Sequence, residues 1–187
     1  MKVYSLHILK LHSIALAATL ACLLLTFGAH AGQTAHLTLT MNGALIEGDS
    51  TTLSMGRENT IECLSWESEI YQPGASTTPL VHRPIKFVKR VDKATALLAK
   101  ALGENQTGSG TFRFYRPGPT GGGTEEQFLR VTLAGVRVKS HRILSPNAIT
   151  PATANQPVLE EVTLSYTSIT IIYEPNGTEA TLDVRAP

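Results

Sequence analysis

The segment RPIKFVKRVDKATALLAKALG, residues 83–103, passes from strand-like sequence to a helical spacing of apolar residues. Pro84 opens the strand-like part, which continues through Ile85 and Phe87 to Lys89. A proline costs least at the first position of a strand, where its missing N–H is not needed by the ladder. The segment therefore predicts a strand that leads directly into a helix.

The helix is predicted over about residues 92–102. Asp92 is a plausible N-cap, Lys100 lies in the last turn, and Gly103 stands where a left-handed residue after the helix belongs. A helix this short is marginal alone, so it must dock its apolar side on a sheet. That side is a single stripe at positions i, i+3, i+4, i+7 and i+8, formed by Ala94, Leu97, Leu98, Ala101 and Leu102.

Upstream of this segment the apolar residues alternate. Leu37, Leu39 and Met41 alternate with threonines, and Asn42-Gly43 follows as a hairpin signal. A second strand is predicted from about Thr60 to Tyr71. In this strand Leu64, Trp66 and Ile70 would share one face, and Ile61 and Cys63 the other.

Downstream the pattern is again that of strands. A strand is expected at 111–115, and long strands are expected at 128–143 and 159–173. In the second, the apolar face changes at Ala134-Gly135, which indicates a bulge. A similar change falls near Thr167-Ser168. Residues 145–157 read as a loop, and residues 175–187 as an edge strand or a tail.

Two features of composition limit the fold and function. The 187 residues suit one domain, and the many strands with one helix predict a mainly β fold. This would be a β-barrel or a two-sheet sandwich over residues 32–174, with the helix on one side. Lys and Arg number 16 against 15 Asp and Glu, so the net charge of +1 argues against a nucleic-acid partner.

The first 31 residues have the three parts of a secretory signal peptide: basic Lys2 and Lys10, an apolar run over 14–27, and Ala29-His30-Ala31. The run is shorter than a bilayer span, so a retained anchor is the weaker alternative. We expect cleavage after Ala31, export through the periplasm and no stable membrane insertion afterwards. Because Lys2 and Lys10 are the only charges removed, 14 basic and 15 acidic residues remain.

No pattern of residues indicates a metal or a cofactor. His36, His82 and His141 lack the short spacings of metal ligands, and Cys63 has no cysteine nearby. Cys63 alternates with apolar residues, so it is expected to be a buried structural thiol. We predict that the protein binds no cofactor.

Nor does a catalytic constellation emerge. Glu67 and Glu69 share a strand face, and a solvated face is far commoner than an acid–base pair. His82-Arg83 is expected to be an exposed polar pair, and Trp66 a core or subunit-interface residue. We predict that the protein is not an enzyme.

Residues 72–83, QPGASTTPLVHR, contain two prolines, a glycine and small polar residues, which predict a long loop. Loops of this length are usually functional or mobile.

Taken in order, several segments resemble the Hcp family, the tube protein of the bacterial type VI secretion system. They are LTLTMNG at 37–43, IECLSWE at 61–67, RPIKFVKRVDKAT with LLAKAL at 83–102, FLRVTL at 128–133, and EEVTLSY with ITI at 160–171.

The resemblance implies a barrel with one flanking helix, assembled as a hexameric ring. Rings would stack into a tube, with type VI effectors and spike proteins as partners. In the family an extended loop reaches the neighbouring subunit or ring, and residues 72–83 occupy that place. The resemblance thus implies these interface candidates: Gln72, Pro73, Gly74, Leu80, Val81 and His82.

The leader is a departure from the family pattern, because tube subunits assemble in the cytoplasm. The alternative is an exported or surface binding module that reuses the same fold.

Overall fold

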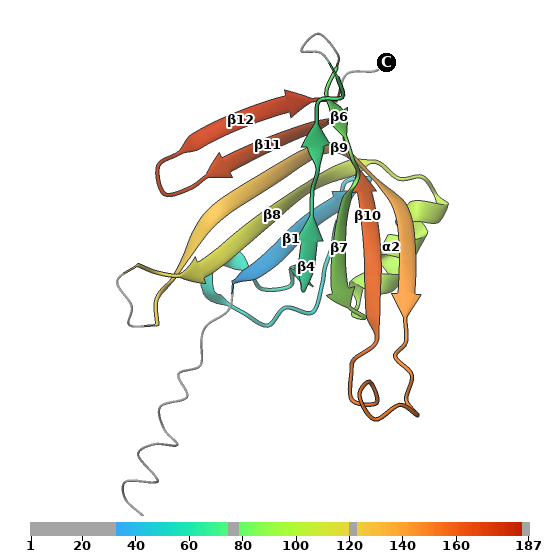
Figure 1. Cartoon of the computed structure of the whole chain (residues 1–187). Helices are drawn as coiled ribbons and strands as arrows, with labels where there is room; N and C mark the ends of the chain where they lie inside the picture. Colours follow the sequence, from blue (N-terminus) through green and yellow to red (C-terminus); the bar gives the residue numbers. More distant parts are fainter. Residues whose placement is uncertain (1–32, 75–78, 120–122, 185–187) are drawn as a thin grey trace, which may run out of the picture. The chain divides into compact units, whose positions relative to one another are not determined.

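A computed structural model describes residues 33–74, 79–119 and 123–184 of the chain. The predicted leader, residues 1–31, lies outside these ranges. Figure 1 shows strongly curved antiparallel strands with one helix beside them. This confirms the predicted mainly β fold with a single flanking helix. The elements are β1 (Thr34–Met41), β2 (Ala44–Ile46), the 3-10 turn η1 (Ser54–Gly56), β3 (Ile61–Cys63), β4 (Ser65–Glu67), β5 (Ile70–Tyr71), β6 (Val81–His82), β7 (Ile85–Arg90), α2 (Ala94–Gly103), β8 (Gly108–Pro117), β9 (Glu125–Leu144), β10 (Leu159–Ser165), β11 (Ser168–Tyr173) and β12 (Thr178–Asp183).

The main sheet closes on itself. Its strand order is β2-β1-β8-β9-β10-β7-β4, and β3 pairs with β1. Since β4 pairs with β7 and directly follows β3, residues Ile61–Glu67 connect the two sides of the sheet. Closure removes the free edges that an open sheet would expose. The architecture is therefore a barrel. β11 pairs with residues 129–134 of β9, β10 pairs with residues 137–144 of the same strand, and β12 pairs with β11.

The prediction of a single strand over 60–71 is wrong, because the chain forms three short strands there, with breaks at Leu64 and at residues 68–69. Cys63 is buried as predicted and Ile61 is buried beside it, whereas Leu64 is exposed. At Leu64 the chain leaves β1 and turns to β7, and the Leu64 N–H donates to the carbonyl oxygen of Val88 at 2.7 Å. The change of partner reverses which side chains face inward, so Trp66 packs inside and Leu64 does not.

The predicted bulge in β9 is present at Gly135. Ala134 pairs with Ser109 and Val136 with Gly108, so Gly135 is left over in the register. Its φ is +60°, and a Cβ there would lie 2.3 Å from Thr167 Oγ1. Thr167 also marks the bend between β10 and β11, where the second change of face was expected. β9 and the β10–β11 segment therefore bend at the same place. Before the bend β9 pairs with β8 and β11, and after it β9 pairs with β10.

The helix differs from its prediction at both ends. It begins at Ala94, but Asp92 still caps it, because the Ala94 N–H donates to Asp92 Oδ1 at 2.8 Å. Gly103 is the last helical residue, and Asn105, with φ +50°, is the left-handed residue instead. Within the described ranges, no helix is long and apolar enough to span a bilayer.

The predicted helix stripe is too wide. Ala94, Leu98 and Ala101 are fully buried against the barrel, while Leu97 is 43% exposed. The helix contacts mainly β9 and, less extensively, β2. The largest fully buried side chains include Phe87, Phe112, Leu37, Leu133 and Leu164, and Trp66 packs edge-on against Phe112 and Phe114 at ring-centre distances of 5.9 and 5.1 Å.

The two remaining segments are described in part. Residues 145–157 connect β9 to β10 and contain no strand. Of the alternatives for residues 175–187, the structure shows an edge strand, because β12 pairs with β11 along its whole length.

Candidate functional site: a hairpin arm and the charged groove at its base

A two-stranded hairpin extends from the barrel and lies outside its main sheet. In it Ile70 pairs with His82 and Tyr71 with Val81. Figure 1 shows this hairpin rising past the ends of the barrel strands at the top of the view. We call residues 70–82 the arm.

The arm is held at its base by contacts on both strands. The Arg83 N–H donates to the carbonyl oxygen of Glu69 at 3.0 Å, and the Arg83 guanidinium pairs with the Glu69 carboxylate at 3.2 Å. The same guanidinium lies over the Tyr71 ring, 5.4 Å from its centre. His82 Nδ1 lies 3.2 Å from the Tyr166 hydroxyl, which ties the arm to the end of β10. These contacts fix the direction in which the arm leaves the barrel.

The six interface candidates all lie on the arm. Gly74, with φ +78°, precedes residues 75–78, which lie outside the described ranges. Leu80 is exposed, whereas Val81 and His82 are half-buried. The prediction of an uninterrupted loop over 72–83 is wrong at Val81 and His82, because their backbones pair with β5. A two-residue strand has no detectable alternation, so the sequence offered no signal for it. Gln72 and Pro73 lie between β5 and Gly74.

His82 and Arg83 were expected to be an exposed polar pair, and this prediction is wrong for His82. Arg83 is exposed, but the His82 ring packs edge-on against Tyr166 with ring centres 5.7 Å apart. Burial and a hydrogen bond from Ser68 act in opposite directions on the Tyr166 hydroxyl, and burial prevails and raises its pKa. Tyr166 therefore stays protonated and can hydrogen-bond the arm at any ordinary pH.

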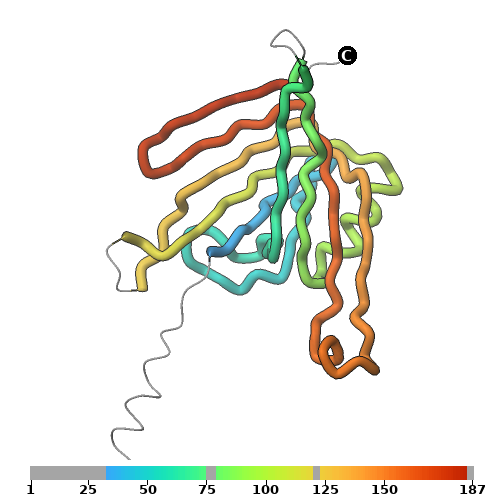
Figure 2. The backbone as a smooth tube through the Cα atoms, in the orientation of Figure 1, coloured from blue at the N-terminus to red at the C-terminus, as the bar shows by residue number. Residues whose placement is uncertain are grey.

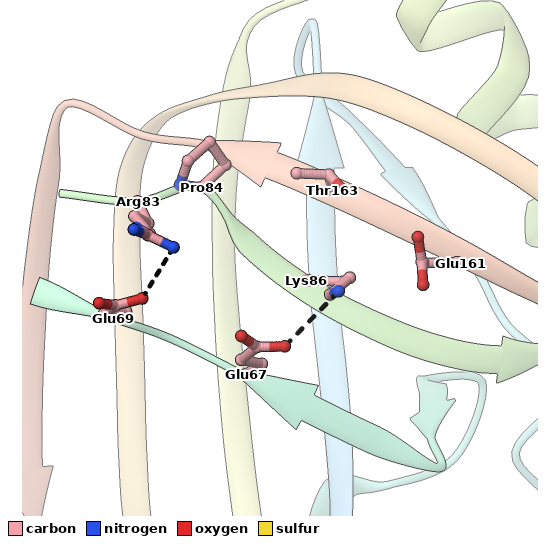
Figure 3. A pocket seen from close by; sticks show the side chains of 7 residues that line it. All are labelled: Glu67, Glu69, Arg83, Pro84, Lys86, Glu161 and Thr163. Carbon is pink, nitrogen blue, oxygen red and sulfur yellow. Dashed lines mark ion pairs between the residues drawn. The ribbon is translucent and has the colours of Figure 1, made fainter.

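A charged groove of about 310 Å³ opens beside the base of the arm. Figure 3 shows Glu69 facing Arg83 and Glu67 facing Lys86, the latter pair 3.6 Å apart. Glu67 and Glu69 share a side as predicted, and each carboxylate faces a cation rather than the other carboxylate. Such an arrangement suits a polar contact surface better than proton transfer. The full lining is Glu67, Glu69, Arg83, Pro84, Lys86, Glu161 and Thr163.

A buried polar cluster was missed from the sequence. Lys89 and Glu160 form an ion pair with both side chains completely buried. Asp92 accepts a hydrogen bond from Lys89 Nζ at 2.6 Å, and His141 Nε2 lies 2.7 Å from Glu160 Oε2. The spacing of Lys89 was the available signal, because it lies two residues after Phe87 and so on the inward side of β7. The cluster joins β7, β9 and β10 to the start of α2.

His36 is the buried histidine of a second cluster. Its Nδ1 lies 2.9 Å from Thr60 Oγ1, and its ring packs edge-on against Tyr115. Burial, followed by the nearby Arg57 guanidinium, lowers the pKa of His36. Arg57 also pairs with Glu125 and lowers the pKa of that carboxyl. This cluster fastens the 47–60 connection to the barrel.

Across the described ranges, no group of three His, Cys, Asp or Glu side chains is placed to hold a metal ion. Cys63 is buried as predicted, and burial raises the pKa of its thiol well above the usual range. A protonated, buried thiol is a poor nucleophile and a poor metal ligand.

The structure was compared with solved structures. It is similar to a crystal structure described as an Hcp protein, with a TM-score of 0.73 and 20% identity over 83% of this chain and all of the other. It is also similar to Hcp1 from the E. coli EAEC 042 pathovar, with a TM-score of 0.66 and 26% identity over 80% of this chain and 96% of that one. The secreted protein Hcp3 from Pseudomonas aeruginosa matches with a TM-score of 0.67 and 22% identity, covering 83% of this chain and all of that one.

Sequence comparisons agree with the fold. The major exported protein of Pseudomonas aeruginosa is 29% identical over 153 residues, which cover 78% of this chain and 87% of that protein. The family profile described as "Type VI secretion system effector, Hcp" matches residues 38–173, from β1 to the end of β11. The match includes the arm, the groove and the buried cluster, and the chain therefore belongs to the Hcp family of the type VI secretion system.

Proposed function

We propose that this protein is a non-enzymatic structural subunit that assembles into six-membered rings, and that the rings stack into a tube of a type VI secretion apparatus. The observation that carries the proposal is the family match, which covers residues 38–173. A tube subunit needs a rigid wall rather than a reaction centre. The closed sheet and its continuous buried core suit that role.

The arm is the proposed contact between subunits or rings. It extends from the barrel, carries exposed Tyr71 and Leu80, and has a fixed base at Glu69 and Arg83. A rigid base limits the entropy lost when Tyr71 and Leu80 bind a neighbour, which favours a defined contact. The proposed interface residues are Gln72, Pro73, Gly74, Leu80, Val81 and His82. Effectors and spike proteins are the further partners that this role would imply.

The test is the solution mass of the purified protein, measured by light scattering on a sizing column. A mass about six times that of the protomer, or a multiple of it, is the expected result. A protein that stays monomeric at high concentration would contradict the ring. Turnover of a substrate that is lost on changing one polar residue would contradict the non-enzymatic role.

The leader favours a second candidate, an exported or surface binding module with the same fold. Residues 1–31 combine a basic start, an apolar run and an Ala-His-Ala site. If the leader is cleaved, the protein reaches the periplasm and then the outside of the cell without entering an inner tube. Fusing residues 1–31 to a reporter enzyme distinguishes the two. Export of the reporter would favour the second candidate, and retention in the cytoplasm would favour the tube subunit.

A further inference from the structure

Asparagine is followed by glycine at two places in the chain, residues 42–43 and residues 176–177. An asparagine before glycine readily loses its side-chain amide, because glycine has no side chain to shield its backbone nitrogen from the asparagine side chain. Both pairs lie in exposed turns between antiparallel strands, the first between β1 and β2 and the second between β11 and β12. Sequence and exposure therefore do not distinguish the two pairs, whereas the contacts of each asparagine do.

Asn42 is held by a distant segment of the chain. Its N–H donates to the carbonyl oxygen of Thr107 at 2.8 Å, and its Oδ1 accepts a hydrogen bond from the Thr107 N–H at 3.3 Å. The side-chain bond must break before the Asn42 side chain can approach the Gly43 nitrogen. The backbone bond resists the rotation of Asn42 that this approach requires. Both contacts therefore protect Asn42.

The Asn176 side chain is instead directed along its own following peptides. Its Oδ1 accepts a hydrogen bond from the Thr178 N–H at 3.0 Å, which is an Asx turn. An Asx turn copies a β-turn with the side-chain carbonyl in place of a backbone one, so the side-chain carbon folds over the Gly177 nitrogen. The Thr178 N–H would also stabilise the negative charge that develops on Oδ1 when that nitrogen attacks. The local contact of Asn176 therefore favours attack by the next nitrogen.

One backbone hydrogen bond opposes the reaction at Asn176. The Gly177 N–H donates to the carbonyl oxygen of Tyr173 at 3.0 Å, so the turn must open before the nitrogen can attack. Among the described strands β12 pairs with β11 alone, and nearly all of its residues are exposed. Local opening costs least at such an edge. Figure 2 shows the hairpin in red, with its turn at the free end.

We propose that Asn176 is a site of spontaneous deamidation, which the fold favours at this residue over Asn42. The Gly177 nitrogen attacks the side-chain carbon of Asn176, a new C–N bond forms, and the bond from that carbon to Nδ2 breaks. The amide leaves as ammonia with the proton of the Gly177 nitrogen, and a succinimide ring remains. Water then opens the ring at either carbonyl and leaves aspartate or isoaspartate. The reaction needs one chain and water, so it does not rest on the assembly of rings.

Either product changes the β11–β12 hairpin. A carboxylate at position 176 stands two residues from Glu174, whose own carboxylate pairs with Arg130 at 2.8 Å and accepts a hydrogen bond from Gln127 Nε2 at 2.8 Å. Isoaspartate also adds a carbon to the backbone of the turn, which disturbs the pairing of Tyr173 with Thr178. We therefore expect the hairpin of an aged molecule to open more often than that of a freshly folded one.

The rates of mass gain at the two asparagines test the proposal. The purified full chain is incubated at mildly alkaline pH, and the peptides that contain residues 42 and 176 are followed by mass spectrometry. We expect Asn176 to convert about tenfold or more faster than Asn42, because Asn42 must give up its hydrogen bonds to Thr107. The matched control is the same chain in urea, where these contacts are lost and the two positions should convert at similar rates.

Two further readouts address the route. Isoaspartate, detected by its methylation with an isoaspartyl methyltransferase, is expected beside aspartate, since direct hydrolysis of the amide gives aspartate alone. Asn176→Gln should abolish the fast mass gain and leave the slow gain at Asn42 unchanged. Equal rates at the two positions of the folded chain would overturn the proposal. So would an unreacted Asn176 in the folded chain under conditions in which the chain in urea converts, or aspartate as the sole product.

Discussion

Lys89 and Glu160 form an ion pair that has no exposure to solvent, at the point where helix α2 meets the sheet. Two further groups complete the cluster. Asp92 accepts from Lys89 and caps the helix through its other contact to the Ala94 N–H, while His141 contacts the second oxygen of Glu160. The cluster therefore holds the first turn of the helix on the barrel, and Thr95 of that turn also donates to Glu160 Oε1 at 3.0 Å.

Removing one member of this pair should be severely destabilising. Lys89→Met takes the cation from both of its carboxylate partners, Glu160 and Asp92, and leaving a buried charge unpaired in this way costs about 3–5 kcal/mol. Glu160→Gln leaves Lys89 paired with Asp92, so it should cost less than Lys89→Met. The double variant Lys89→Met/Glu160→Leu removes both charges and should recover part of that loss. The measurement is the free energy of unfolding in urea. Lys86→Met, which breaks the exposed pair with Glu67, is the control and should change stability by less than ~1 kcal/mol.

The helix offers a matched pair of adjacent leucines. Leu98 is completely buried against the barrel and Leu97 is 43% exposed. Leu98→Asp would bury an unpaired charge and should cost several kcal/mol, enough to unfold much of the protein at 37 °C. Leu97→Asp should lower the melting temperature only slightly. Equal losses from the two substitutions would mean that the helix is rotated from the position described.

The widest gap between sequence and structure concerns side chains whose partners come from distant strands. The alternation at Leu37 and Leu39, the bulge at Gly135 and the helix itself are local patterns, and each was predicted. Leu64 was misplaced because its strand exchanges β1 for β7 at that residue, and an exchange of partners leaves no local period. Lys89 could have been placed inward by its spacing from Phe87, but its partner Glu160 lies 71 residues away.

In the candidate site, too, local patterns could be predicted and contacts between distant segments could not. The composition of residues 72–83 identified the segment, because prolines and small polar residues disfavour long regular strands. The strand pair within it depends on Ile70 and Tyr71, which precede the segment. The contact between Val91 and Val158 could not be predicted, because the two residues become neighbours only when β7 and β10 pair.

Gly135 should tolerate no side chain. Its φ of +60° disfavours any other residue, and a Cβ would also lie 2.3 Å from Thr167 Oγ1. We expect Gly135→Ala to cost more than Gly177→Ala, since Gly177 has a φ of +70° and open space around it. The conformational cost of a Cβ at positive φ is common to both and amounts to about 1–2 kcal/mol. The difference between the urea midpoints of the two variants measures the cost of the clash with Thr167. Identical midpoints would show that Thr167 moves aside freely.

His36 should make stability depend on pH. Burial, and after it the charge of Arg57, lowers the pKa of His36 in the folded protein. Below about pH 6.5 the histidine is therefore protonated in the unfolded chain but stays neutral in the folded chain. The free energy of unfolding should fall as the pH drops below 6.5, by up to about 1.4 kcal/mol per pH unit from this group. His36→Gln should lose that part of the slope in urea titrations between pH 5 and pH 8. An unchanged slope would assign the dependence to other groups.

The arm can be separated from the fold by a deletion. Removing residues 74–80 leaves Tyr71 able to pair with Val81 and leaves the base contacts of Glu69 and Arg83 in place. We therefore expect the melting temperature to change little while the solution mass falls toward that of the protomer. A second variant replaces residues 75–80 with glycine and serine at equal length. If the side chains of the arm make the contact, this variant also fails to assemble. If only the length of the arm matters, the variant assembles. A deletion that leaves no folded protein would place the segment in the core and remove it from the proposed interface.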